Sequence, residues 1–159
     1  MKNKKKKSSI IQVSIGVLVV ILAILIIIMM GIVSDIQGTA RIVNYTGLVR
    51  GETQRLIKLE LSMQQENEMI HDIRTFIDGL RNGNDELNLV RLNDVDFQNK
   101  MQELDDKFSD VYKIIYLVRF KGARNTDIIP ESEEFFVICD EATGLAEKYS
   151  QKKATSLSL

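Results

Sequence analysis

An uninterrupted apolar segment constrains this chain more than any other feature. Residues 10–33 are nearly all Ile, Leu, Val, Met, Ala or Gly, with Gln12 and Ser14 as the polar exceptions, and no charge occurs from position 8 to 34. A helix of this length rises roughly 36 Å, enough to cross a hydrocarbon core of about 30 Å. Because a backbone in lipid must satisfy its own hydrogen bonds, the segment predicts a transmembrane helix with the lipid bilayer as its partner.

The charges on either side of this segment predict its orientation in the membrane. Five lysines stand at positions 2 and 4–7, whereas from Asp35 onward 16 basic residues face 22 acidic ones. Lysines that flank a span stay in the cytoplasm. We therefore expect a single-pass protein of the cell membrane, with residues 1–9 as a cytoplasmic basic stub and residues 34–159 outside the cytoplasm. A basic cluster beside an apolar span and an acidic domain exclude a nucleic-acid binder.

A cleaved signal peptide is the competing interpretation of the apolar segment. The apolar region of such a peptide is typically about 7–15 residues long, and the segment here is much longer. Gly38-Thr39-Ala40 resembles a cleavage site but lies several residues beyond the apolar run. No cysteine directly follows the segment, which excludes a lipoprotein anchor. An uncleaved anchor is the favoured interpretation.

The exported residues have the composition and spacing of helices. They contain one proline and no tryptophan, and apolar residues recur at steps of three and four. Helices are expected at about 35–62, 66–80, 94–121 and 130–153, and whether residues 62–67 break the first one stays open. The sequence therefore predicts an all-α fold, in which an N-terminal transmembrane helix continues into an up-down four-helix bundle.

Local signals place the ends and the core of these helices. Asp94 is expected to cap the third helix, Pro130 to begin the last, and residues 81–85 to form a turn. Cys139, in an apolar stretch, is expected to be buried and structural. The predicted apolar positions are Ile42, Leu48, Leu56, Leu59 and Met63 in the first helix, Met69, Ile70, Ile73, Phe76, Ile77 and Leu80 in the second, and Phe97, Met101, Leu104, Phe108, Val111, Ile115 and Val118 in the third.

The C-terminal end predicts a continuation. Residues 154–159 carry no capping signal, and the last helix of an up-down bundle returns toward the membrane. A second apolar span is expected at that point, and the sequence contains none. We therefore expect the chain to be a piece of a longer protein, truncated before a second transmembrane helix.

Two glycines four residues apart stand out in the first predicted helix. Gly47 and Gly51 each cost about 1 kcal/mol relative to alanine in a helix interior, which favours a site where another backbone or a ligand comes close. Helical spacing puts Asn44, Gly51 and Arg55 on one face, and Gly47 and Arg50 on the neighbouring one. The planar fork of an arginine suits an oxyanion. Across a two-fold axis Arg50 would meet its own copy, with an anion between the two charges.

The segment 43–56, Val-Asn-Tyr-Thr-Gly-Leu-Val-Arg-Gly-Glu-Thr-Gln-Arg-Leu, resembles a family pattern. The pattern Ile-Asn-x-Ala-Gly-x-x-Arg-x-x-x-x-Arg-Leu occurs near the start of the periplasmic domain of nitrate/nitrite sensor histidine kinases and in the N-terminal domain of type IV pili methyl-accepting chemotaxis transducers. Helical ectodomains attached to diguanylate cyclases and hybrid histidine kinases are similar. Val43 and Thr46 replace the usual Ile and Ala.

The resemblance implies a four-helix sensor domain between two transmembrane helices, which forms a homodimer and binds a small anion between the first helices. It implies that Arg50 contacts the anion and that Asn44, Gly47 and Arg55 are structural or supporting positions. The spacing of Gly47 and Gly51, by contrast, favours a role in helix packing. Ion-paired or solvated arginines are the alternative, because Glu52 and Glu60 place carboxylates near them.

These patterns lead to two hypotheses for the function. The first is a membrane-anchored extracytoplasmic sensor module of a bacterial signal-transduction receptor, which senses a small, possibly anionic ligand and relays a helix shift across the membrane. The alternative is a single-pass structural or interaction protein with a ligand-free bundle. No enzymatic activity, metal or cofactor is expected, because the sole histidine, His71, fits a surface position and no catalytic or metal-binding spacing occurs.

Overall fold

The computed structural model describes the backbone of residues 2–156, and the side chains of residues 12–156 other than positions 35, 125, 154 and 156. The side chains of the N-terminal lysines and the residues after 156, on which the predictions of a cytoplasmic stub and a truncated end depend, lie outside this description. The chain divides into two compact units, Met1–Gln37 and Gly38–Leu159.

Helix α1 has the bounds Lys2–Leu61; its N-terminal part makes up the described residues of the first unit, and its C-terminal part belongs to the second unit. Nearly all side chains from 12 to 34 are exposed, and most of them are large and apolar. Among the described residues, this is one helix that is long and apolar enough to cross a membrane. A helix that is apolar on every face needs an apolar environment such as lipid.

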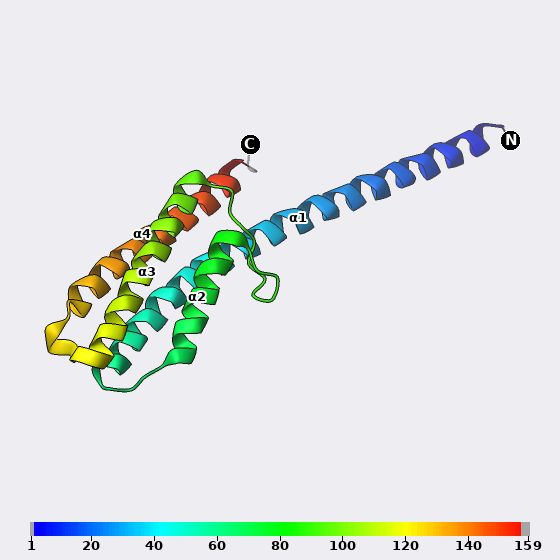
Figure 1. Ribbon diagram of the computed structural model, residues 1–159. Helices are drawn as coiled ribbons and strands as arrows, with labels where there is room; N and C mark the ends of the chain where they lie inside the picture. Colours follow the sequence, from blue (N-terminus) through cyan, green and yellow to red (C-terminus); the bar gives the residue numbers. More distant parts are fainter. Residues whose placement is uncertain (1, 157–159) are drawn as a thin grey trace. The chain divides into compact units, whose positions relative to one another are not determined.

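The second unit is an all-α, up-down bundle of four helices, as predicted (Figure 1). The C-terminal part of α1 is followed by α2 (Asn67–Asn82), α3 (Val95–Lys121) and α4 (Ile128–Ser156), with the short 3-10 helix η1 (Ala123–Asn125) before α4. The part of the chain that the structure describes contains no strand, only an isolated bridge between Asn84 and Leu89. Residues 62–67 do break the first helix. Helix α1 ends at Leu61, and Met63 adopts a left-handed conformation with φ 61°.

The helix boundaries follow the local signals in the sequence. The Asp94 side chain accepts a hydrogen bond from the Phe97 backbone N–H at 2.9 Å and so caps α3, as expected. Gly83 ends α2 and Gly122 ends α3, both with positive φ (86° and 79°), a conformation that glycine adopts without a Cβ clash. Pro130 lies in the first turn of α4, two residues after its start.

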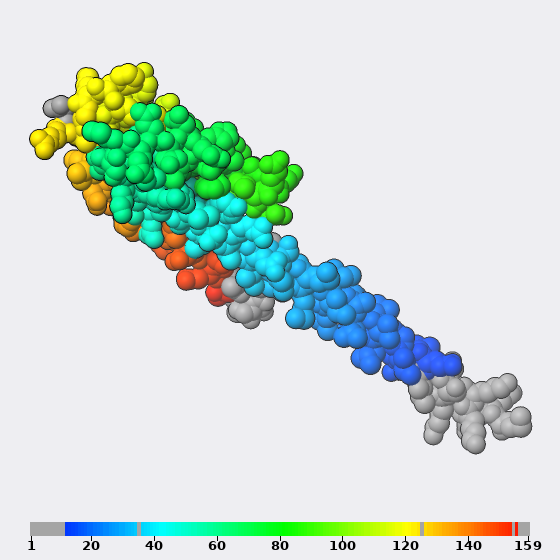
Figure 2. All heavy atoms as spheres, turned by 90° about the horizontal axis from the view of Figure 1, so that it is seen from below, coloured from blue at the N-terminus to red at the C-terminus, as the bar shows by residue number. Residues whose placement is uncertain are grey.

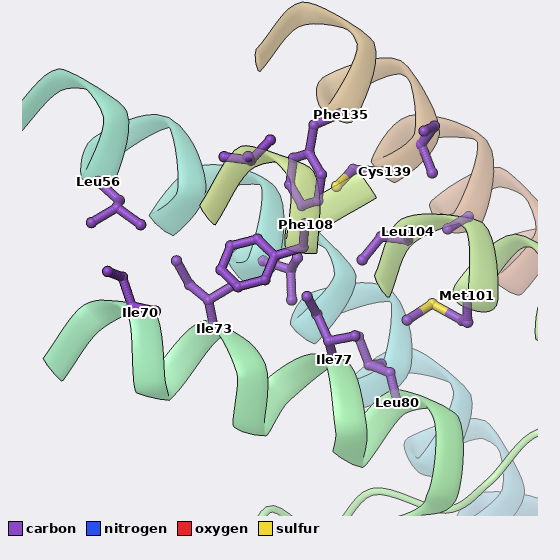
Figure 3. Close-up of a cluster of buried hydrophobic side chains, with 14 of the residues drawn as sticks. Leu56, Ile70, Ile73, Ile77, Leu80, Met101, Leu104, Phe108, Phe135 and Cys139 are labelled. Atoms are coloured by element: carbon purple, nitrogen blue, oxygen red, sulfur yellow. The ribbon is translucent and has the colours of Figure 1, made fainter. Parts of the chain in front are cut away.

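All four helices contribute to one core (Figure 3). All seven positions predicted on α3 are buried. Phe108 and Phe135 pack in its centre, with ring centroids 5.8 Å apart, and Ile73 and Leu56 approach from α2 and α1. Cys139 is fully buried, as predicted. On α2, Met69 and Phe76 pack only partly against this core, while the other four predicted positions are buried.

The apolar stripe predicted for the first helix is wrong at Leu48 and Met63, and Leu59 is only half-buried. Leu48 is 38% exposed and Met63 is 91% exposed, whereas Ile42 and Leu56 are fully buried. The face of α1 that enters the core also contains polar residues, and the prediction counted apolar residues alone. The buried polar residues of α1 are Thr39, Thr46, Thr53 and Glu60.

Candidate functional site

Arg50 lies on α1 where this helix faces α4. Its Nη1 donates a hydrogen bond to the Asp140 carboxylate, and its guanidinium lies over the Phe136 ring, 5.0 Å from the centroid. The Arg50 side chain remains 39% exposed. No other described group accepts a hydrogen bond from its Nε or Nη2. Arg50 is therefore held in orientation from one side and keeps donors for a further acceptor.

Arg55 lies on a different face of α1. Five residues along a helix correspond to a rotation of roughly 140°. Its side chain is 65% exposed, and its Nη1 lies 3.7 Å from the Glu52 carboxylate. Arg50 and Arg55 were both predicted to serve the ligand, and the structure does not bring them together within one chain.

Arg55 lines a groove between α1 and α2 of about 280 Å³. Leu48, Met69 and Phe76 are the apolar residues that line it, and the remaining lining residues are Glu52, Glu66, Glu68 and Asp72. Four carboxylates against one guanidinium make the groove electronegative. Such a groove disfavours an anion.

The other predicted positions are accessible within this chain. Asn44 and Gly51 are exposed and Gly47 is half-buried. A Cβ added at either Gly47 or Gly51 would meet no heavy atom within 4 Å. The described part of this chain therefore does not explain the two glycines, and the prediction that another chain approaches them stays a prediction.

The sequence interpretation placed the Glu60 carboxylate near Arg50 and Arg55. In the structure, Glu60 instead forms an ion pair with Arg119 on α3. The Glu60 side chain is 1% exposed and that of Arg119 is 15% exposed. Arg119 donates from Nε at 2.8 Å and also from Nη2 to the two carboxylate oxygens, and from Nη1 to the Asn67 side chain at 2.8 Å. We call this pair the Glu60–Arg119 clasp. It lies at the end of the bundle where α1 and α3 finish.

The remaining reactive side chains form no site in the described region. His71 is exposed, as expected, and no three His, Cys, Asp or Glu side chains within the described part of the chain gather in a metal-binding group. Burial raises the pKa of the Cys139 thiol to about 12, so this thiol stays protonated near neutral pH.

A comparison with solved structures finds a domain of similar fold, whereas comparisons of the sequence find no match. Models of protein families do not match the sequence, and no curated protein matches it. The ligand-binding domain of the P. aeruginosa nitrate receptor McpN superposes with a TM-score of 0.61 and 15% identity, over 69% of this chain and 96% of that domain. The chain has the fold of that domain. The four-helix sensor fold implied by the resemblance of residues 43–56 is thereby confirmed as a fold.

Asp140 and Phe136 are the neighbours of Arg50 that the sequence interpretation missed. They are about 90 residues away from it in the chain, and no local pattern connects such distant positions. The two residues of the Glu60–Arg119 clasp are 59 positions apart in the chain, so no local pattern predicts their contact either.

Proposed function

We propose that this chain is the membrane anchor and extracytoplasmic sensor module of a bacterial signal-transduction receptor. The observation that carries the proposal is the fold, which the bundle shares with nearly the whole ligand-binding domain of a nitrate receptor. The apolar N-terminal half of α1 supports an anchor in the lipid bilayer. The lysines before it favour a cytoplasmic N-terminus, with residues 34–159 outside the cytoplasm.

The proposal includes a small anion as ligand and Arg50 as the residue that binds it. Asp140 and Phe136 hold the Arg50 guanidinium in one orientation, while its Nε and Nη2 are available for an oxyanion. The partial neutralisation by Asp140 reduces the repulsion between two copies of Arg50 across a dimer axis. The half-buried Gly47 lies on the face of Arg50, and the neighbouring α1 face with Asn44 and Gly51 is exposed, so the two faces together offer room for the second copy of a homodimer.

The proposed output is a helix shift, because a ligand that binds two states unequally changes their populations. An enzymatic or chemotaxis domain in a longer parent protein would convert this shift into a signal, and the chain itself is proposed to have no catalytic activity. The alternative function is a ligand-free interaction module. One observation favours it, since Arg50 already has an acidic partner within the chain.

Nitrate is the probe that tests the proposed function. In a chloride-free buffer, saturating nitrate is expected to raise the Tm of the full chain in detergent by about 2–5 °C, because a ligand that binds only the folded state stabilises it. R50Q is expected to abolish this shift. K58Q removes another exposed charge of α1 and is expected to keep it. An equal Tm shift in wild type and R50Q would contradict the assignment of Arg50 as the anion-binding residue. If neither nitrate nor another small oxyanion changes the Tm of the wild-type chain, the result favours the interaction module.

A further inference from the structure

A pocket of about 360 Å³ lies at the end of the bundle where α1 and α3 finish (Figure 1). Its apolar wall consists of Leu61, Met63, Val118 and Ala123, which belong to the ends of these two helices and to the segments that follow them. Its volume is within the range of pockets that hold small organic molecules. Arg50 does not line this pocket, which is therefore separate from the site of the proposed anion.

Met63 stands at a position of the helix end where glycine is the usual residue. The Met63 backbone N–H donates to the Glu60 carbonyl oxygen at 3.0 Å, and that of Gln64 to the Leu59 carbonyl oxygen at 2.9 Å. These two hydrogen bonds form a Schellman motif, whose left-handed residue is usually glycine because a Cβ is unfavourable there. Helices α2 and α3 both end at a glycine with positive φ. At the end of α1, Met63 adopts φ 61° instead.

The Met63 side chain does not serve the core either. It is 91% exposed, although it is large and apolar. Neither the backbone conformation nor the packing therefore explains a methionine here. Strained backbone positions cluster at sites that contact a ligand, and the flexible, polarizable methionine side chain suits binding surfaces. Because Met63 lines the pocket, contact with a bound molecule accounts for this side chain.

The polar wall of the pocket indicates what kind of molecule fits. It consists of the Glu60–Arg119 clasp and Gln65. The charges of the clasp balance each other, so the lining has no net charge. Arg119 has five N–H donors, of which three have an acceptor among the described residues. A charged ligand would lose water without gaining a counter-charge. An uncharged ligand with an acceptor oxygen would use a remaining donor of Arg119.

We propose that this pocket binds a small uncharged organic molecule, with its apolar body against Met63 and a hydrogen-bond acceptor on Arg119. The proposal adds a second ligand site to the bundle. It depends on neither Arg50 nor nitrate, so either site can fail its test without the other.

Benzamide is the probe, because it combines an apolar ring with a carbonyl acceptor and carries no charge. We titrate it into the full chain in detergent and follow the 13C-labelled methyl groups of methionine and valine by NMR. The Met63 and Val118 signals should move together and saturate with a Kd of about 1–10 mM, the range for a molecule of this size. Met69, in the groove beside Arg55, and Met101, in the core, should keep their signals.

Benzoate and benzylammonium test the charge of the ligand, because each has nearly the shape of benzamide and adds one charge. Both are expected to bind several-fold more weakly than benzamide. Equal or tighter binding of either ion overturns the proposed ligand class. An absence of saturable changes at Met63 and Val118, at benzamide concentrations well above the expected Kd, overturns the site itself.

M63G separates ligand binding from folding. It is expected to weaken benzamide binding several-fold, measured at Val118, and to raise Tm by about 1–3 °C, because glycine adopts the left-handed conformation without strain. N88G is the matched control, since Asn88 is also left-handed, with φ 51°, and does not line the pocket. It should leave the Kd unchanged. An unchanged Kd in M63G, or a lowered Tm, would show that Met63 does not serve a ligand and overturn the proposal.

Discussion

Replacing Arg119 with alanine lowers the free energy of unfolding by about 3–5 kcal/mol, because it leaves the Glu60 charge buried without a partner. Both carboxylate oxygens of Glu60 accept from Arg119, and hydrogen bonding to Glu60 raises the pKa of the Arg119 guanidinium. The Arg119 guanidinium therefore stays charged near neutral pH. Denaturant unfolding of the full chain in detergent, followed by circular dichroism, measures the loss.

R124A is the matched control for this substitution. Arg124 lies in η1, a few residues beyond α3, and is exposed. Its replacement is expected to change the free energy of unfolding by less than about 0.5 kcal/mol. The double variant E60L/R119M removes both charges and should be less destabilised than R119A. A stability of R119A within about 1 kcal/mol of wild type would mean that the clasp is not a buried ion pair in solution.

Replacing Phe108 with alanine also lowers the free energy of unfolding by about 3–5 kcal/mol, the range for deleting a buried ring. Phe108 is fully buried in the middle of α3, beside Phe135 (Figure 3), and the Arg74 guanidinium lies 5.5 Å from its centroid. Its removal leaves a cavity in the core, which the surrounding side chains fill only partly.

Phe120 provides the control on the same helix. It is 70% exposed and contacts the Tyr116 ring, with centroids 4.5 Å apart. F120A should therefore change stability by less than about 1 kcal/mol. If F108A and F120A lowered the free energy of unfolding by similar amounts, Phe108 would not lie in the core as the structure places it.

The helices and most of the core could be predicted from the sequence, and α3 shows why. Its seven buried residues, all apolar, recur at alternating steps of four and three, Asp94 caps its start and Gly122 ends it. Each of these signals acts within one or two turns of the chain. Local physical chemistry therefore suffices to place the helix and to say which face is buried.

The core face of α1 could not be predicted by the same rule. The rule excludes the threonines at 39, 46 and 53 from the core because they are polar, and it places Leu48 there because it is apolar, although the Leu48 side chain is exposed. The heptad spacing of the threonines was the available signal. The sequence and the structure thus disagree where a helix buries polar residues, and such positions are typical of functional elements.

The residues that surround Arg50 could not be predicted without the fold. The motif placed Arg50 on the first helix, but α4 supplies Asp140 and Phe136 only when the bundle is formed. In Figure 2, atoms of this part of α1, in cyan, lie at the surface of the bundle. The Arg50 guanidinium is thus accessible to solvent on one side and held by the Asp140 carboxylate on the other.

Isothermal titration calorimetry with nitrate on the D140N and R50Q variants tests whether Arg50 binds the anion, because the two substitutions act on the same guanidinium in opposite ways. Asparagine keeps an acceptor for Arg50 and removes the competing charge. We predict that full-chain D140N binds nitrate several-fold more tightly than wild type does, and that R50Q binds none. Nitrate affinities that neither substitution changes would contradict the proposal that Arg50 binds the anion.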